Sequence, residues 1–330
     1  MNLDTTYLGL ALPHPFVAGA SPLADELDNV RRLEDAGAAA IVMSSLFEEQ
    51  ITHEQMAAYF ADEFSGEGSS ETFSGLPESG SFGARPQEYL EHLQRVRKAV
   101  ALPIVGSLNG STSGGWLEYA RLIEEAGADA LELNVYSLAT DPWRSAAELE
   151  EETVELLRAV RSAVQIPLAV KLSPFYTSLA HFAERLFDAG ADGLVLFNPF
   201  FQPDIDIERQ AIDRSLHLSL ASDLALRLRW LAILSAQIRT SFAVSGGVHT
   251  SSDAVKAVMT GADAVQLVSE LLAHGPERLR TLREEFAYWL ADHQYESVAQ
   301  LRGTMNLRAC PDPASYERAN YMYILHNWRR

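Results

Sequence analysis

Short apolar runs alternate with amphipathic segments along most of this chain. The runs have the length of strands, and the segments between them place apolar residues every three or four positions, which is the period of a helix. Four runs stand alone after a proline or a polar turn, at residues 16–20, 104–108, 168–172 and 242–244. Four others close the stretches 35–43, 125–133, 188–196 and 261–268. The pattern therefore predicts eight strands.

One short motif recurs before each of the four strands that close these stretches. A helix ends, Ala-Gly-Ala or Gly-Ala follows, and an apolar strand begins. Glycine ends a helix because it accepts the left-handed conformation, and a small alanine lets the chain turn back toward the sheet. The repeat predicts successive helix–strand units of one kind.

The intervening segments predict eight helices, at residues 25–36, 86–100, 115–126, 146–164, 178–189, 220–237, 252–260 and 277–292. Eight strands alternating with eight helices indicate an α/β protein with a closed parallel (β/α)8 TIM barrel. An open doubly wound sheet is the alternative, and the number of units argues against it. Strand interiors are almost wholly apolar, as a sheet covered on both faces requires. We expect one domain over residues 1–330, with 293–330 as a C-terminal tail.

Two segments interrupt the repeat on the side where the strands end. Asp62–Gly83 follows the second strand and is rich in glycine, serine and acidic residues. Asn198–His217 follows the sixth strand and is similarly long. A loop as long as Asp62–Gly83 is usually a lid or is disordered. The tail after His293 is expected to cover the barrel or to contact a second subunit.

Composition excludes several classes of partner. The 26 basic and 45 acidic residues give a net charge of −19, which disfavours nucleic acid and anionic membranes as partners. No run approaches the length of a membrane span, and the first residues lack the features of a signal peptide. Cys310 is the single cysteine, so the chain forms no internal disulfide and holds no cysteine-ligated iron–sulfur cluster. We expect a cytoplasmic protein.

The seventh and eighth strands carry the features of a phosphate site. Ser245-Gly246-Gly247 follows one strand, a helix capped by Ser251, Ser252 or Asp253 comes next, and Val268-Ser269 closes the other strand. Glycines at a strand end can turn backbone N–H groups toward an anion, and barrels commonly bind phosphate after these two strands. A plain tight turn is the alternative reading of the two glycines.

Polar residues at the carboxyl ends of barrel strands face the active site. Here the strand ends carry Ala20, Ser21, Ser44, Ser107, Asn109, Asn134, Lys171 and Asn198. A buried lysine needs an anionic partner. Lys171 is therefore a salt-bridge partner of a residue such as Glu132, a Schiff-base nucleophile, or a fixed cation beside an electron-accepting ring.

Two asparagines flank Lys171 on the neighbouring strands. Asn134 and Asn198 offer amide donors and acceptors that suit a planar, amide-rich ring. Ser137 lies on the loop after Asn134 and is a candidate to relay a proton, although most loop serines bond only to backbone. The histidines are scattered, and we predict no metal site.

Together these residues resemble the dihydroorotate dehydrogenase family, whose members are FMN enzymes on a (β/α)8 barrel. The matching pieces are 15–22 (PFVAGASP), 75–77 (GLP), 133–134 (LN), 170–174 (VKLSP), 197–198 (FN), 244–248 (VSGGV) and 261–267 (GADAVQL). The resemblance runs from Leu8 to about Leu272. The ending Tyr316–Met322 resembles a branch known as dihydroorotate dehydrogenase-like.

The resemblance implies a set of roles. The phosphate of FMN would be held by Gly246, Gly247, Val268 and Ser269. Ala20, Ser21, Ser44 and Ser107 would lie by the flavin, with Lys171 at its N1/O2 edge. Asn134, Asn198, Gly75 and Leu76 would contact the substrate, with Asn134 also touching the cofactor. Ser137 falls where the family keeps its catalytic base, which removes one proton while a hydride leaves for the flavin.

The chain departs from the family pattern at three positions. Ser44 stands where the family usually has a lysine that touches flavin and substrate, and Thr72 and Ala139 stand where it has asparagines. The resemblance implies a dehydrogenase of pyrimidine biosynthesis that oxidises dihydroorotate or a related cyclic amide, works as a homodimer and passes electrons to a partner. A Schiff-base aldolase that uses Lys171 and a non-catalytic flavin or electron-transfer subunit are the alternatives.

Overall fold

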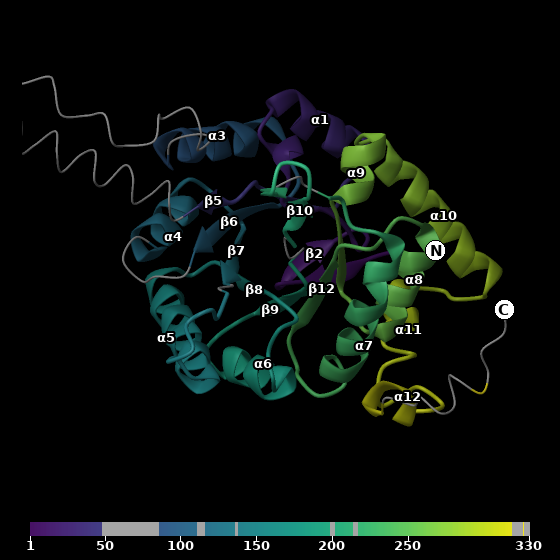
Figure 1. The fold of residues 1–330 in the computed structure, drawn as a ribbon. Helices are drawn as coiled ribbons and strands as arrows, with labels where there is room; N and C mark the ends of the chain where they lie inside the picture. Colours follow the sequence, from purple (N-terminus) through teal and green to yellow (C-terminus); the bar gives the residue numbers. More distant parts are fainter. Residues whose placement is uncertain are drawn as a thin grey trace, which may run out of the picture.

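The computed structural model describes residues 1–47, 86–110, 116–135, 138–198, 202–213, 217–318 and 326. In this part of the chain, parallel strands form a barrel surrounded by helices (Figure 1). The strand order is β4-β3-β13-β12-β9-β8-β7-β6, and β4 also pairs with β6, so the two ends of this order meet. The predicted (β/α)8 TIM barrel is therefore confirmed. The open doubly wound sheet is wrong, because such a sheet keeps two unpaired edges.

Each predicted strand and helix has a counterpart in the structure. The barrel strands are β3 (Phe16–Ala18), β4 (Ile41–Val42), β6 (Ile104–Gly110), β7 (Ala130–Val135), β8 (Leu168–Leu172), β9 (Gly193–Leu196), β12 (Ser241–Ser245) and β13 (Ala264–Leu267). A short strand, β5 (Leu46–Phe47), follows β4 and pairs with β6. The surrounding helices are α1 (Leu27–Asp35), α3 (Pro86–Ala99), α4 (Trp116–Glu125), α5 (Ala146–Ala163), α6 (Leu179–Asp188), α7 (Leu224–Leu234), α8 (Ser251–Thr260) and α10 (Arg278–Asp292).

The helix after β12 begins one residue earlier than the sequence predicts. Its N-cap is Thr250, not Ser251, Ser252 or Asp253. The Thr250 hydroxyl accepts the Asp253 N–H at 3.2 Å, and the Asp253 carboxylate accepts the Thr250 N–H at 3.0 Å. This reciprocal pair is a capping box, in which the acidic residue occupies the third helical position. Gly261 ends the helix with φ of +117°, as predicted.

An N-terminal hairpin fills the bottom of the barrel. It consists of β1 (Thr5–Tyr7) and β2 (Leu10–Leu12), and it inserts Tyr7, Leu8 and Leu12, each at most 2% exposed. The barrel layer that they contact consists of small side chains: Val17, Val42, Val105, Ala130, Ala169, Val195, Ala243 and Ala264. Such residues alone leave space inside a barrel, and the hairpin fills it with apolar surface removed from water. A Cβ on Gly193 would come within 2.4 Å of Leu8, so the fit also depends on that glycine.

A buried histidine beside this layer should make stability depend on pH. His14 Nδ1 accepts the Phe16 N–H at 3.2 Å, and Nε2 donates to the Gly37 carbonyl at 2.8 Å. This pattern requires the neutral ring. Burial, with a smaller effect of nearby Arg283, lowers the pKa of His14 from 6.5 to about 4, although the bond to Gly37 acts in the opposite direction.

We expect the neutral His14 to contribute stability that is complete above pH 6.5 and is lost as the pH falls to about 4. The loss should reach about 3 kcal/mol, because each unit of pKa difference is worth about 1.4 kcal/mol. Urea unfolding at pH 7 and pH 4.5 would measure it. His14→Gln should weaken this pH dependence, and the exposed control His181→Gln should leave it unchanged. Equal pH dependence in all three proteins would contradict this account.

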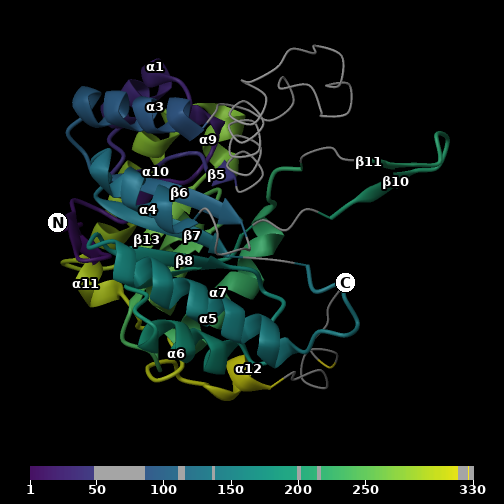
Figure 2. The ribbon, with the colours of Figure 1, turned by 90° about the vertical axis from the view of Figure 1, so that its left-hand side faces the viewer.

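Several further elements were not predicted. A short helix, α9 (Ser269–His274), follows β13, and the 3-10 turns η1 (Pro22–Ala24) and η2 (Ala221–Asp223) precede α1 and α7. The expected loop Asn198–His217 contains a hairpin of β10 (Asp204–Asp206) and β11 (Ala211–Asp213), which projects from the barrel on the side of the strands' carboxyl ends (Figure 2). Asp62–Gly83, the other expected loop, lies outside the described residues.

The described part of the C-terminal tail lies against the barrel. It contains α11 (Val298–Leu301) and α12 (Ala314–Glu317). Arg302 Nε pairs with Asp263 Oδ1 at 2.6 Å, and the Gly303 N–H donates to the Val258 carbonyl at 3.0 Å. The described part of the tail thus covers part of the barrel, which is one of the two roles expected from the sequence. Within the described residues, no helix has the length and apolar character needed to cross a membrane.

Candidate functional site

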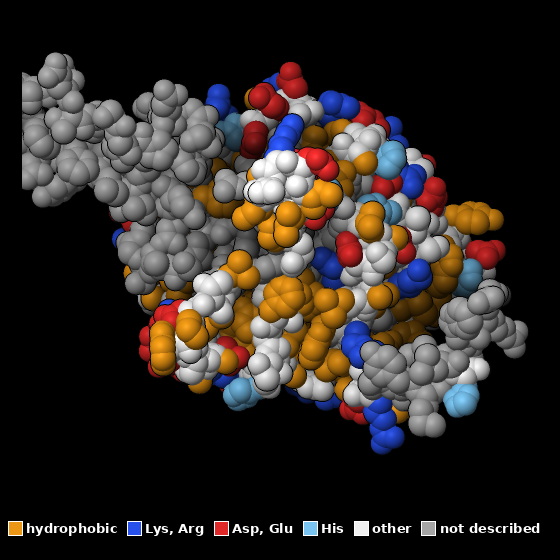
Figure 3. All heavy atoms as spheres, viewed as in Figure 1, with side chains coloured by type: hydrophobic (Ala, Val, Ile, Leu, Met, Phe, Trp, Pro, Cys, Tyr) orange, Lys and Arg blue, Asp and Glu red, His pale blue; other side chains and the backbone are white. Residues whose placement is uncertain are grey.

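The strands' carboxyl ends lie on the face that Figure 1 presents to the reader. Figure 3 shows the same face with hydrophobic side chains gathered across its middle. The residues that the sequence singles out follow β3 and β4, lie on or after β6 to β9, or follow β12 and β13.

A charged group lies inside the barrel. Lys171 Nζ donates to Glu132 Oε1 at 3.2 Å and to Gln266 Oε1 at 3.4 Å. Gln266 Nε2 donates to Glu132 Oε2 at 2.5 Å, which completes a ring of three side chains. All three are at most 3% exposed. The salt bridge to Glu132 is therefore present, and the matched charges make Lys171 a cation of fixed position within the barrel.

An amide cluster lies next to the charged group, toward the open end of the barrel. Asn134 Nδ2 donates to Ser107 Oγ at 2.9 Å and to the Leu108 carbonyl at 3.1 Å, and Asn198 Nδ2 lies 3.5 Å from Asn134 Oδ1. Asn134 is directly paired with Lys171 in the register of β7 and β8. The structure thus brings together Asn134, Asn198 and Lys171, which the sequence placed on consecutive strands.

Of two adjacent serines after β4, the second faces this cluster. Ser45 Oγ lies 2.8 Å from Ser107 Oγ and 3.3 Å from Asn134 Nδ2. Ser44, the residue singled out from the sequence, instead donates to the Asp25 carboxylate. Sequence reasoning missed Ser45, because a short strand followed by an irregular turn does not show which of two neighbours points inward.

The glycine pair after β12 forms a concave turn. Gly246 and Gly247 have φ of +84° and +79°, a conformation that other residues rarely adopt. The Gly247 N–H donates to Ser219 Oγ at 3.0 Å, and this hydroxyl lies 2.9 Å from Ser269 Oγ. The Ser219 N–H also donates to Ser269 Oγ, at 3.0 Å. The predicted phosphate residues Gly247 and Ser269 therefore converge on one hydroxyl.

A buried arginine packs against the glycine turn. Arg227 is 6% exposed, and its guanidinium donates to the carbonyls of Ser245 and Asp223. Burial lowers its pKa, and the charge of Asp223 partly offsets this effect. A Cβ on Gly246 would lie 2.9 Å from this guanidinium. Sequence reasoning missed Arg227, because nothing in the sequence distinguishes it from Arg229 in the same helix.

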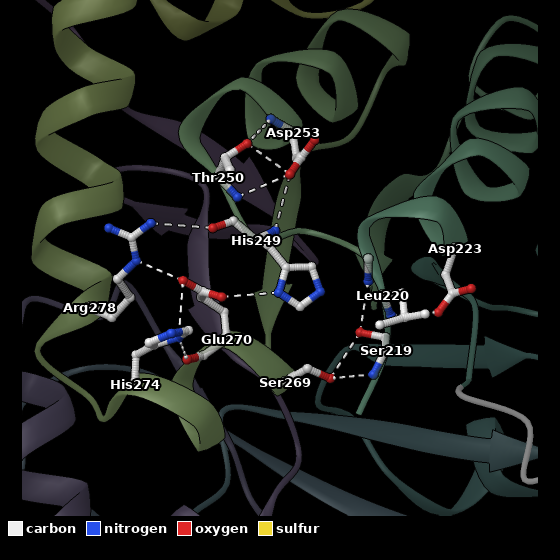
Figure 4. Close-up of polar contacts among 11 residues, drawn as sticks. Ser219, Leu220, Asp223, His249, Thr250, Asp253, Ser269, Glu270, His274 and Arg278 are labelled. Atoms are coloured by element: carbon white, nitrogen blue, oxygen red, sulfur yellow. Dashed lines mark hydrogen bonds and ion pairs between the residues drawn. The ribbon is translucent and has the colours of Figure 1, made fainter. Parts of the chain in front are cut away.

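A second polar group flanks the turn on the side of β13. Glu270 Oε1 accepts Arg278 Nε at 2.7 Å, and Glu270 Oε2 lies 3.0 Å from His249 Nδ1 (Figure 4). Burial acts to raise the pKa of Glu270, but the hydrogen bonds from Arg278 and His249 prevail and lower it. His274 Nδ1 also lies 3.4 Å from Glu270. These residues were not predicted from the sequence.

The remaining predicted site residues are placed as follows. Ala20 and Ser21 follow β3, where Ser21 is 8% exposed. Val268 follows β13, and a Cβ on Gly19 would lie 2.7 Å from its side chain. Ser137, Gly75 and Leu76 lie outside the described residues, as does Thr72. Within the part that the structure describes, no cluster of histidine, cysteine or acidic residues is arranged to hold a metal ion.

The residues present fit FMN, the cofactor that the resemblance implies. A Cβ on Gly247 would come within 2.5 Å of the Leu224 backbone nitrogen, so the turn leaves no room for a side chain. His249 Nε2 is buried and has no hydrogen-bond partner among the described residues. Turned backbone N–H groups beside an unused ring nitrogen suit a phosphate, and the cation at Lys171 suits the electron-rich edge of a flavin.

Comparison with known proteins gives consistent results. The family profile described as "Dihydroorotate dehydrogenase" matches residues 2–290. The dihydroorotate dehydrogenase B (NAD(+)) catalytic subunit of Methanocaldococcus jannaschii is 31% identical over 137 residues, covering 40% of this chain and 43% of that protein. Its counterpart from Methanocella arvoryzae is 28% identical over 208 residues, covering 63% of this chain and 65% of that protein.

A relative with a different name matches a similar stretch. The NAD-dependent dihydropyrimidine dehydrogenase subunit PreA of Escherichia coli K12 is 25% identical over 211 residues, covering 60% of this chain and 48% of that protein. The chain thus spans less than two thirds of the length of each of these relatives. Because the family profile is matched over nearly the whole barrel, the chain belongs to the dihydroorotate dehydrogenase family.

Proposed function

We propose that this protein is an FMN-dependent oxidoreductase that oxidises a CH–CH bond next to a carbonyl in dihydroorotate or a related cyclic amide. One observation carries the proposal. The buried cation Lys171 and the amides of Asn134 and Asn198 share one end of the barrel with the glycine turn at Gly247. A flavin needs both a phosphate site and a positive group at the ring, and the family supplies the reaction class.

Each residue then has a distinct task. Gly246, Gly247, Val268 and Ser269 would bind the phosphate, and Ala20, Ser21, Ser44 and Ser107 would lie by the ring system. Lys171 would stabilise negative charge at the N1/O2 edge. When bound, the flavin supplies the hydride acceptor. Asn134, Asn198, Gly75 and Leu76 would orient the substrate amide, and Ser137 would remove the proton from the neighbouring carbon.

We infer that the substrate ring lacks the carboxylate of dihydroorotate. Ser44 replaces the lysine usual in the family, and it donates to Asp25 rather than facing Asn134. A substrate carboxylate would therefore lose a charged partner, which is worth about 1.5–3 kcal/mol.

A spectrum followed by anaerobic titration tests the function and separates the two substrates. The purified protein should be yellow, and 5,6-dihydrouracil should bleach it faster than dihydroorotate does. Bleaching by dihydroorotate alone would keep the enzyme class and reject the neutral ring. A colourless protein that takes up no added FMN would overturn the whole proposal and restore the Lys171 aldolase as the leading alternative.

We further propose a cytoplasmic homodimer that passes electrons to a partner protein. Some relatives are named as subunits, which supports a partner. The hairpin β10–β11 exposes Ile205, Ile207 and Ile212 at 69%, 77% and 61%, an apolar surface of the kind that dimers bury.

We expect replacement of all three hairpin isoleucines by threonine to convert the dimer to a monomer, because the substitution removes the apolar surface while keeping strand propensity. Light scattering coupled to size-exclusion chromatography measures the mass. Tyr288→Thr on α10, also at a highly exposed position, is the matched control and should remain dimeric. A monomeric wild-type protein would reject the homodimer.

A further inference from the structure

Among the described residues, only one of the two ring nitrogens of His249 has a hydrogen-bond partner. Glu270 carries a lowered pKa and accepts on both oxygens, so His249 Nδ1 must be the donor in the 3.0 Å contact with Glu270. The other nitrogen, Nε2, is shielded from solvent and finds no partner among the residues that the structure describes. A buried ring nitrogen without a partner is unfavourable unless a ligand supplies one.

The idle nitrogen lies on the side of the glycine turn. His249 is two residues after Gly247, and Glu270 directly follows Ser269, so the chain itself holds the histidine beside the predicted phosphate residues. In Figure 4 the ring edge opposite Glu270 points toward the side where Ser219 and Ser269 lie. The ring orientation is fixed in turn, because Arg278 holds Glu270 at 2.7 Å.

Ser219 indicates what kind of atom belongs at this place. Its hydroxyl oxygen accepts the Gly247 N–H at 3.0 Å and lies 2.9 Å from Ser269 Oγ. An oxygen acceptor thus already occupies the point on which the turn converges. Phosphate oxygens are stronger acceptors of the same kind, because they carry charge. The Gly247 N–H is therefore directed at an oxygen acceptor, and Ser269 Oγ accepts both the hydroxyl and the N–H of Ser219.

We infer that His249 recognises the phosphate group of a phosphorylated cofactor through Nε2, with Glu270 and Arg278 as the residues that position it. This inference rests on the proposed FMN function and adds a side chain to a site otherwise built from backbone and hydroxyl groups. In its imidazolium form the ring donates from both nitrogens, to Glu270 on one side and to the phosphate on the other.

The test compares two ligands that differ only in the phosphate. Apoprotein is titrated with FMN and with riboflavin, and quenching of flavin fluorescence gives each dissociation constant. His249→Gln should weaken FMN binding by roughly 10- to 100-fold, the value of a charged hydrogen bond. Riboflavin binding should stay unchanged. His274→Gln is the matched control, because His274 also contacts Glu270 but has an exposed side chain, and it should leave both constants unchanged.

The outcomes separate this inference from the function on which it rests. Wild-type binding of FMN with an unchanged constant in His249→Gln would overturn the role of His249 and leave the flavin function standing. Equal losses for FMN and riboflavin, or an equal loss in His274→Gln, would also overturn it, because the effect would then come from the fold. A wild-type protein that binds neither flavin would remove the proposed function itself.

Discussion

Replacing Lys171 by methionine is expected to destabilise the protein by about 3–5 kcal/mol, the usual consequence of removing one partner from a buried ion pair. The substitution keeps most of the side-chain volume but leaves the Glu132 carboxylate, which is 0% exposed, with Gln266 as its described polar contact. An uncompensated charge inside the barrel is unfavourable because no water can solvate it. Denaturant unfolding of the apoprotein measures the loss.

Two further variants identify the cause of that loss. Lys171→Met combined with Glu132→Gln should recover much of the stability, because the second change removes the stranded charge. Lys256→Met is the control, since Lys256 also pairs with an acidic residue, Asp253, but its side chain is 56% exposed. Exposed pairs contribute at most about 1 kcal/mol. If the double variant is as unstable as Lys171→Met, charge burial is not the reason.

The same substitution should impair flavin reduction even where the protein folds. A fixed positive group at a site of developing negative charge typically contributes about 10²–10³-fold to a rate. We expect a loss of this order in the anaerobic bleaching rate of Lys171→Met, with FMN still bound. If Lys171→Met were bleached as fast as the wild-type protein, Lys171 would have no part in the reaction and would be a structural residue.

Gly247→Ala is expected to destabilise the protein by about 2–5 kcal/mol and to abolish FMN binding. A positive φ costs a residue with a Cβ about 1–3 kcal/mol, and overpacking adds a similar amount. The added Cβ would lie 2.5 Å from the Leu224 nitrogen and 2.9 Å from its Cα. These are backbone atoms at the start of α7, so relief requires the helix to move.

Gly9→Ala isolates the steric part of this effect. Gly9 has φ of +74°, close to the +79° of Gly247, and a Cβ there would meet nothing within 4 Å. Its substitution should therefore carry only the conformational penalty, about 1–3 kcal/mol. Unfolding midpoints of the two variants measure the difference. Equal destabilisation would show that the close approach of α7 has no effect on stability.

The sequence was a good guide to the barrel because the relevant signals are local. The Gly-Ala turn at Gly261, for example, requires only a positive φ at one residue. The N-terminal hairpin escaped prediction for the opposite reason. Tyr7 and Leu12 are recognisable as core residues only once the alanines of several distant strands are known to leave space between them.

The candidate site also contains residues that the sequence predicted and residues that it did not. Lys171, Asn134 and Asn198 could be found from the sequence, because strand ends in a barrel converge wherever the strands lie along the chain. The contacts of Ser45 with Ser107, and of His249 with Glu270, depend on the direction of individual side chains. That direction follows from packing, which periodicity does not record.

The sequence by itself determined the closed barrel, the family and the strands that carry the site, because alternation, turn residues and strand ends are properties of short segments. Only the tertiary structure decided three further points. Lys171 contacts both Glu132 and Gln266, Arg227 contacts the glycine turn, and His249 Nε2 has no partner among the described residues. These contacts join residues from different elements of the chain. They can therefore stabilise the protein only once the barrel has closed.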